Sequence, residues 1–165
     1  MEILDDFLDK KTYQEIKDVM LGGDLAWFAQ SGKSIPNEGE RQLTHLIFSE
    51  NRPTSQIFDL LKPIRDKLNV AAPIREKANL TFYDSGSGDM FHTDIYKAKN
   101  VKTSIFYITD RGATILQKDG EEIKVDAREN RVVTFDANTY HKAVTHKVGH
   151  PFRVVINFNY YKAEH

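Results

Sequence analysis

The sequence contains no cysteine among its 165 residues. Without thiols the chain cannot form disulfide bonds, zinc–thiolate sites or iron–sulfur clusters, and it cannot use a cysteine nucleophile. Catalysis by a thiol and metal sites that depend on sulfur ligands are therefore excluded. The absence of cysteine does not indicate which redox compartment the protein occupies.

Long apolar runs are also missing. No stretch approaches the roughly 18 consecutive apolar residues that a membrane-spanning helix needs. The first residues, Met1 to Asp6, lack the basic region and the apolar stretch of a secretory signal. We therefore expect a cytoplasmic protein that does not enter a membrane.

The chain has no block of charge of a single sign. Its 23 basic and 24 acidic residues are mixed along the sequence, for a net charge of −1. Proteins that bind nucleic acid or membrane surfaces concentrate basic residues. The charge pattern therefore argues against both and favours a small molecule, a peptide or a protein as substrate. It does not indicate an oligomeric state.

Two helices are predicted in the N-terminal part. Asp9 can cap the first, and Gly22-Gly23 ends it, as glycine does where the backbone turns left-handed. Its apolar side chains recur at helical spacing: Tyr13, Ile16, Val19 and Met20. The second helix begins at Thr54-Ser55, and its apolar side chains are Ile57, Leu61, Ile64 and Leu68. Pro63 lies inside this second pattern, where it should kink or split the helix.

From Asn79 the sequence changes to short strands separated by turns. The predicted strands cover residues 79–84, 90–95, 101–109, 112–117, 121–125, 131–136, 141–146 and 152–161. Asp119-Gly120 is a tight-hairpin signal between two of them. Eight short strands after two helices predict a mainly β, α+β fold, a double-stranded β-helix (jelly roll) buttressed by the helices. We expect one domain over 1–165, with helical support over 1–78 and the jelly-roll core over 79–161.

The pattern Phe91-His92-Thr93-Asp94 suggests a metal site. His92 and Asp94 are two residues apart, so on an extended strand both side chains leave the same face. One imidazole and one carboxylate supply two ligands of a 2-His-1-carboxylate facial triad, which suits non-haem Fe(II) and leaves positions open for other ligands. The pair alone is weak evidence, because a three-residue pattern recurs by chance.

Three histidines compete to be the third ligand, namely His141, His146 and His150. His150 precedes Pro151 in a predicted turn, and His146 lies five residues beyond His141, so on a continuous strand it faces the other way. His141 enters a strand after a bend, as His92 does. We therefore favour His141.

Arg153 opens the next apolar strand, between Phe152 and Val154. A buried arginine is costly unless it meets an anion, and its planar fork suits a carboxylate. An arginine twelve residues after the last metal histidine fits the need of an iron enzyme to hold the far carboxylate of a dicarboxylate cosubstrate.

These motifs together resemble the iron(II)- and 2-oxoglutarate-dependent dioxygenases, in their prolyl 4-hydroxylase-like branch. The resemblance covers about residues 79–161. It depends on the order of F-H-T-D at 91–94, T-S-I-F-Y-I at 103–108, R-G-A-T at 111–114, N-R-V-V-T-F-D at 130–136, then His141 and Arg153.

The resemblance implies a jelly-roll enzyme in which His92, Asp94 and His141 bind iron. It also implies that Arg153 binds the distal carboxylate of 2-oxoglutarate and that Tyr83 and Tyr107 add hydrogen bonds to this cosubstrate. No catalytic residue beyond the metal ligands is implied. The cofactors would be Fe(II) and 2-oxoglutarate, with ascorbate as a further candidate.

The first functional hypothesis is hydroxylation of a prolyl or other amino-acid C–H bond, with decarboxylation of 2-oxoglutarate to succinate. An oxidative nucleic-acid demethylase would use the same iron chemistry but would need a basic groove and base-stacking aromatics. A non-catalytic, cupin-like metal-binding jelly roll is the third hypothesis. A cupin site typically prefers a His-x-His pair, whereas this chain has His-x-Asp.

Overall fold

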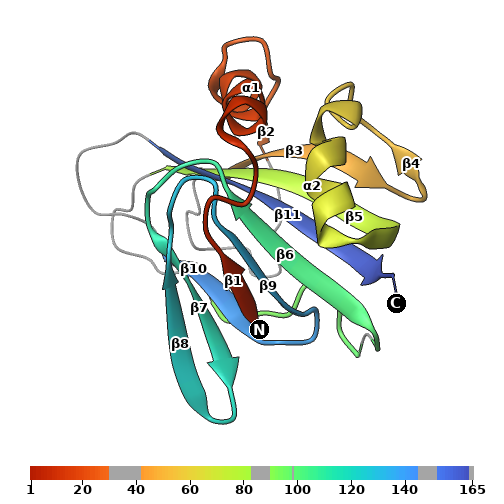
Figure 1. The fold of residues 1–165 in the computed structure, drawn as a ribbon. Coiled ribbons are helices and arrows are strands. Elements are labelled where there is room, and N and C mark those ends of the chain that lie inside the picture. The colour runs from red at the N-terminus through yellow and green to blue at the C-terminus, as the bar shows by residue number, and fades with distance from the viewer. Residues whose placement is uncertain (30–41, 83–89, 98, 145–151, 164–165) are drawn as a thin grey trace.

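The computed structural model describes residues 1–29, 42–82, 90–97, 99–144 and 152–163. Two antiparallel sheets and two α-helices make up this part of the chain (Figure 1). The described ranges contain no helix with both the length and the apolar character needed to cross a membrane.

The larger sheet has eight strands and forms one wall of a jelly roll. Seven of its strands run in the order β1 (Glu2–Leu4), β9 (Val132–Asp136), β6 (Val101–Tyr107), β11 (Phe152–Lys162), β5 (Val70–Phe82), β3 (Gln42–Ser49) and β2 (Phe28–Ala29). The short strand β4 (Arg52–Pro53) also pairs with β3. The second wall is a three-stranded sheet of β10 (His141–Val144), β7 (Ala113–Lys118) and β8 (Glu121–Asp126). The predicted jelly-roll fold is therefore confirmed.

Two apolar layers hold these elements together. One layer packs the helices against the outer face of the larger sheet, and its fully buried members include Ile16, Ile64, Phe106 and Ile156. The other fills the space between the sheets, with Ile105, Leu116, Val133 and Val155 among its members. Figure 1 shows α1 and α2 on one side of the larger sheet and the β7–β8 hairpin away from them. The inner face of the larger sheet is thus left to face the smaller sheet.

The first helix forms where the sequence predicts it. Helix α1 (Lys10–Leu21) starts at Asp9, whose Oδ1 accepts the Thr12 backbone N–H at 3.0 Å. The helix ends at Gly22 as predicted, but not for the predicted reason. Gly22 has an extended backbone with a φ of −71° and is not left-handed. A Cβ atom at Gly22 would instead lie 2.7 Å from the Asp18 carbonyl oxygen. Glycine is needed there for close packing against the preceding turn rather than for a left-handed conformation.

The second helical segment is shorter than predicted. A 3-10 turn, η1 (Asp59–Leu61), leads into α2 (Lys62–Leu68), so no helix begins at Thr54. Pro63 lies in the first turn of α2, where proline's missing N–H costs nothing, and it does not kink a longer helix. The apolar spacing was correct, since Ile57, Leu61, Ile64 and Leu68 are all buried.

Two strand predictions need correction. Strand β5 begins at Val70 rather than at 79, and its early part contains Pro73 at a register irregularity opposite β11. A proline cannot donate to the ladder, so it is tolerated at such an irregularity. The predicted strand 90–95 does not form, since the segment makes only an isolated bridge between His92 and His141. The Asp119-Gly120 hairpin is confirmed, with both residues at positive φ.

Candidate functional site

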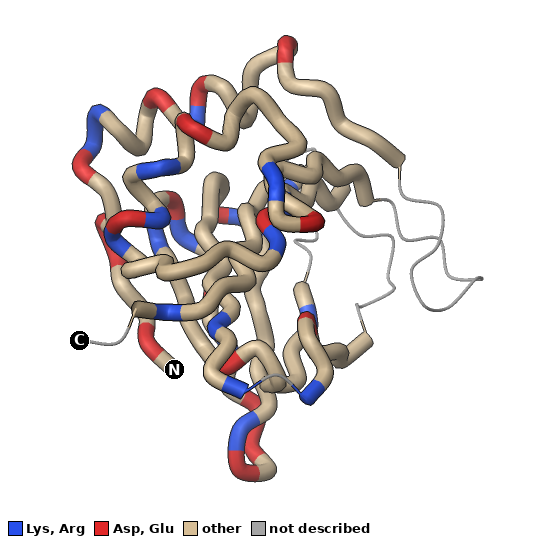
Figure 2. Tube along the Cα trace, turned by 90° about the vertical axis from the view of Figure 1, so that its right-hand side faces the viewer, with Lys and Arg blue, Asp and Glu red and all other residues tan. Residues whose placement is uncertain are grey.

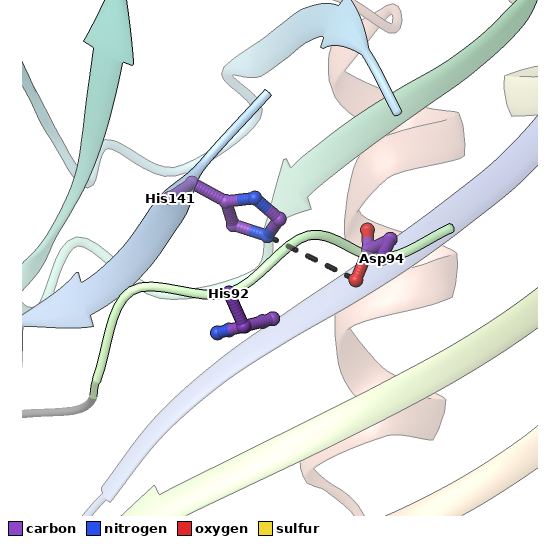
Figure 3. A group of neighbouring side chains, drawn as sticks. All are labelled: His92, Asp94 and His141. Carbon is purple, nitrogen blue, oxygen red and sulfur yellow. Dashed lines mark ion pairs between the residues drawn. The ribbon is translucent and has the colours of Figure 1, made fainter. Parts of the chain in front are cut away.

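Three side chains that the sequence singles out as metal ligands lie together. His92 and Asp94 belong to the segment 90–97, and His141 is the first residue of β10. The His92 N–H donates to the His141 carbonyl at 3.0 Å, and the His141 N–H donates to the His92 carbonyl at 2.9 Å. One potential ligand atom of each residue lies within 4.8 Å of the others. Figure 3 shows the three side chains grouped around one small region.

Each histidine has one ring nitrogen beside a backbone carbonyl two residues earlier. His92 Nδ1 lies 3.1 Å from the Met90 oxygen, and His141 Nδ1 lies 3.0 Å from the Thr139 oxygen. Because a carbonyl oxygen can only accept, each Nδ1 carries a proton, and in the neutral imidazole the lone pair is then on Nε2. Metal-bound histidines are commonly oriented by such a hydrogen bond. Both rings thus offer Nε2 in the form that binds a metal.

The two carboxylate oxygens of Asp94 have different surroundings. Oδ2 accepts hydrogen bonds from Thr103 Oγ1 at 3.0 Å and from Asn159 Nδ2 at 2.9 Å. Oδ1 lies 3.9 Å from His141 Nε2, the contact dashed in Figure 3, and 3.4 Å from Arg75 Nη2. Oδ2 is held by the larger sheet, so Oδ1 is the oxygen that can bind a metal together with the histidines.

The electrostatics of the site favour the protonation states that metal binding requires. Burial is the largest influence on the pKa of Asp94 and raises it, but His141, Asn159, Arg75 and Thr103 outweigh burial and leave the pKa below its usual range. Burial is also the largest influence on His141, and it lowers the pKa of that imidazole. An ionised Asp94 and a neutral His141 are therefore favoured at neutral pH.

Arg153 is buried on the inner face of β11. It is 3% exposed, and its Nη2 lies 3.4 Å from Thr114 Oγ1 on β7. Tyr107 is close by, because its ring centre lies 5.7 Å from the Arg153 guanidinium carbon and its hydroxyl donates to Thr114 Oγ1 at 2.7 Å. The planar guanidinium of Arg153 has the geometry that suits a carboxylate.

A cavity of about 70 Å³ joins the two groups of residues. His92, Asp94 and His141 line it together with Arg153 and Thr114. The apolar side chains of Ile105 and Val155 contribute to its wall, as do polar residues of β5. The arrangement places a cluster able to bind a divalent metal and a buried cation beside one small cavity.

The structure brings together most of the predicted site residues. His92, Asp94, His141 and Arg153 share the cavity, and Tyr107 lies next to it through Thr114. Tyr83 and the competing histidines His146 and His150 lie outside the described residues.

Sequence reasoning missed the residues that hold Asp94 and Arg153. Arg75, Thr103 and Asn159 contact Asp94, and Thr114 contacts Arg153. A signal for Asn159 was present, since it has the same strand parity as Arg153 within an apolar run. Arg75 gave no such signal, because its strand was not predicted.

Comparison with known proteins shows the fold. The sequence matches no protein-family model and no curated protein. Among solved structures, a prolyl hydroxylase from Trichoplax adhaerens in complex with a hypoxia inducible factor peptide is similar, with a TM-score of 0.66 and 14% identity over 97% of this chain and 83% of that one.

Two further solved structures of similar fold are not described as prolyl hydroxylases. The non-haem alpha-ketoglutarate-dependent epimerase SnoN, from nogalamycin biosynthesis, has a TM-score of 0.68 at 13% identity, over 98% of this chain and 78% of that one. HygX from Streptomyces hygroscopicus, with nickel, 2-oxoglutarate and hygromycin B bound, has a TM-score of 0.66 at 11% identity, over 98% and 82%. The chain thus has the jelly-roll fold of a prolyl hydroxylase and of other 2-oxoglutarate-dependent proteins, and within that fold it has a His-Asp-His cluster that could hold a metal ion.

Proposed function

We propose that the protein is an Fe(II)- and 2-oxoglutarate-dependent oxygenase. The observation that carries the proposal is the cluster of His92, Asp94 and His141, which each offer one ligand atom within 4.8 Å of the others and line a common cavity. Two neutral imidazoles and one carboxylate form the donor set that suits non-haem Fe(II) with open positions. These three residues would hold the metal.

Arg153 would bind the distal carboxylate of 2-oxoglutarate. Its guanidinium lies inside the cavity beside Thr114, whose hydroxyl is held by Tyr107. A direct hydrogen bond from Tyr107 or Tyr83 to the cosubstrate stays a prediction, as does any use of ascorbate. The apolar walls at Ile105 and Val155 would limit access of water to the reacting groups.

The reaction that we assign is hydroxylation of a C–H bond. When bound, Fe(II) and 2-oxoglutarate supply the activation of dioxygen, with 2-oxoglutarate converted to succinate and carbon dioxide. The residues of this chain bind and orient the two groups and position the substrate. An amino-acid substrate, a prolyl residue among the candidates, is our first hypothesis, and the peptide bound to the Trichoplax adhaerens enzyme supports it.

Other substrates and roles have less support. HygX binds hygromycin B, so a small molecule is also consistent with this fold. Oxidative demethylation of nucleic acid would need a basic groove. Figure 2 shows basic and acidic residues interspersed along the described part of the chain. A non-catalytic cupin-like role has less support, because the cluster is His-Asp-His rather than one built on a His-x-His pair. Cytoplasmic location and a single domain stay predictions.

Succinate formation tests the proposed function. The protein would be incubated with Fe(II), 2-oxoglutarate and dioxygen, and succinate measured by mass spectrometry. We expect slow succinate release even without added substrate, and at least a tenfold loss in Asp94→Ala. Succinate at the level of a protein-free control, with Fe(II) shown to be bound, would contradict the proposal and favour the non-catalytic alternative.

A further inference from the structure

Arg75 extends from β5 toward the metal cluster. The register of β5 with β11 pairs Arg75 with Asn159, and paired residues point to the same face of a sheet. On that face Asn159 contacts Asp94. The next residue of β5, Glu76, points to the other face, toward α2. The strand thus directs the guanidinium of Arg75 at the carboxylate that we assign to the metal.

Hydrogen bonds hold this guanidinium in place. Arg75 Nε donates to Asn159 Oδ1 at 3.1 Å, and Arg75 Nη2 donates to Asp94 Oδ1 at 3.4 Å. Asn159 Nδ2 in turn donates to Asp94 Oδ2 at 2.9 Å. The three side chains therefore form a closed ring of hydrogen bonds, which keeps the positive charge of Arg75 beside Asp94.

Arg75 contacts the same oxygen that a metal would use. Asp94 Oδ2 accepts from Thr103 and Asn159, which leaves Oδ1 to face His141 Nε2 at 3.9 Å. A metal held by His141 and Oδ1 would share that oxygen with Arg75. The Asp94 side chain is only 5% exposed, so water screens the repulsion between the two cations incompletely. Arg75 therefore opposes the binding of a metal cation that arrives alone.

The anionic cosubstrate of the proposed function changes this balance. The two negative charges of 2-oxoglutarate offset the two positive charges of a divalent metal. A fixed positive charge repels the metal alone, but it has little net effect on a metal and an anion whose charges cancel. A group that disfavours the metal alone and not the loaded site makes each ligand strengthen the binding of the other, because binding free energies are reciprocal.

We propose that Arg75 couples metal binding to cosubstrate binding: it weakens the binding of a divalent metal alone, and 2-oxoglutarate relieves this effect. The inference rests on the proposed function and adds a role for a residue other than the metal ligands and Arg153. Arg75 acts here through its charge on Asp94 Oδ1. Removing it changes the charge beside Asp94 by one unit, whatever other charges surround the cavity.

Calorimetric titration of the metal-free protein with Co(II), with and without saturating 2-oxoglutarate, measures the coupling. In Arg75→Gln, Co(II) alone should bind about tenfold tighter or more, because the divalent cation no longer meets a positive charge. With 2-oxoglutarate present, the wild type and the variant should bind Co(II) within about threefold of each other. The Kd of 2-oxoglutarate for the Co(II)-loaded protein should then be higher in Arg75→Gln by the factor that linkage requires.

Further variants separate charge from shape. Arg75→Lys keeps the charge and should bind Co(II) alone nearly as the wild type does. Arg128→Gln removes the same charge from an arginine that pairs with Asp5 at the surface, and it should leave both binding constants unchanged. Arg75→Met repeats the loss of charge and takes the place of Arg75→Gln if that variant does not fold.

Weaker binding of Co(II) to Arg75→Gln would overturn the proposal, because Arg75 would then only position Asp94. An equal gain in Arg75→Lys, or a difference from the wild type that 2-oxoglutarate does not reduce, would overturn it as well. Failure of the proposed function gives a different result, since the wild type itself would bind no Co(II) or, once loaded, no 2-oxoglutarate. If the wild type binds both ligands and Arg75→Gln matches it, only the role of Arg75 is contradicted.

Discussion

Asn159 connects the metal cluster to the larger sheet. Its Nδ2 donates to Asp94 Oδ2 at 2.9 Å and to Thr103 Oγ1 at 2.9 Å, while its Oδ1 accepts from Arg75 Nε. Asn159 is fully buried, so the groups that form these hydrogen bonds are shielded from solvent. One amide therefore fixes the orientation of the only carboxylate in the cluster.

Asn159→Ala should weaken metal binding by roughly 10- to 100-fold, as the loss of a group that orients a ligand typically does. Asp94 would remain but would lose one of the two hydrogen bonds that hold Oδ2. Titration calorimetry with Co(II) measures the change. Asn157→Ala is the matched control, because Asn157 lies two residues away on the same face of β11. Equal losses in the two variants would mean that Asn159 does not orient Asp94.

Arg153→Met should separate cosubstrate binding from metal binding. The variant keeps His92, Asp94 and His141, so the Kd for Co(II) should stay within about twofold of the wild type. The Kd for 2-oxoglutarate should rise at least tenfold, because a charge-assisted carboxylate contact is lost. Both constants can be measured by calorimetry on the metal-loaded protein. If 2-oxoglutarate binds equally well, Arg153 does not hold its distal carboxylate.

At the scale of elements, the end of α1 depends on a close backbone approach at Gly22. A Cβ atom there would lie 2.7 Å from the Asp18 carbonyl oxygen, whereas a Cβ at Gly23 would meet nothing within 4 Å. The two neighbouring glycines thus differ in the space around them, although the sequence does not distinguish them.

Gly22→Ala should therefore destabilise the protein by about 1 kcal/mol or more, as overpacking does, and Gly23→Ala should be close to neutral. Urea unfolding followed by circular dichroism gives both free energies. Equal changes in unfolding free energy in the two variants would contradict the prediction. They would show that the backbone at the end of α1 adjusts to the new methyl group at Gly22.

The secondary-structure elements also explain which residues of the site could be predicted from the sequence. The proximity of His92, Asp94 and His141 could be predicted from the spacing of His92 and Asp94 and from the order of the motifs along the sequence. The segment 90–95 is not a strand, yet its residues still converge, since the bridge to His141 replaces the expected ladder. Arg75 could not be predicted, because the part of β5 that contains it includes Pro73 and several charged residues and does not resemble a strand. Its place beside Asp94 depends on pairing with β11, more than 80 residues later in the chain.

At the scale of the whole molecule, a buried ion pair joins α2 to the larger sheet. Arg65 Nη1 donates to Glu76 Oε2 at 2.9 Å, and its guanidinium carbon lies 3.7 Å from the Phe58 ring centre. Glu76 is 1% exposed, and its other carboxylate oxygen has no hydrogen-bond partner among the described residues. Burial is the largest influence on the pKa of Glu76 and raises it, despite the opposing effect of Arg65.

This shift predicts how stability changes with pH. A raised pKa in the folded state means that the folded protein binds the Glu76 proton more tightly than the unfolded chain does. The stability that this group contributes is present below the ordinary value of 4.5 and is lost as the pH rises through the folded-state value. Relative to Glu76→Gln, which cannot titrate, the wild type should therefore lose unfolding free energy as the pH rises above 4.5.

Urea unfolding of both proteins across that pH range gives the two curves. The free energy of unfolding of the wild type should decrease relative to that of Glu76→Gln as the pH rises. Parallel curves would mean that Arg65 compensates for the buried charge of Glu76 completely. The result bears on the fold alone, because Glu76 faces away from the metal cluster, between α2 and the sheet.

The most direct test of the central claim is an anaerobic titration of the Fe(II)-loaded protein with 2-oxoglutarate, followed in the visible spectrum. If His92, Asp94 and His141 hold Fe(II) with open positions, chelation by 2-oxoglutarate should produce a charge-transfer band. Asp94→Ala should lose the band. Bound iron without a band would contradict the assignment of an oxygenase site, and failure of the wild type to bind iron would contradict the metal cluster itself.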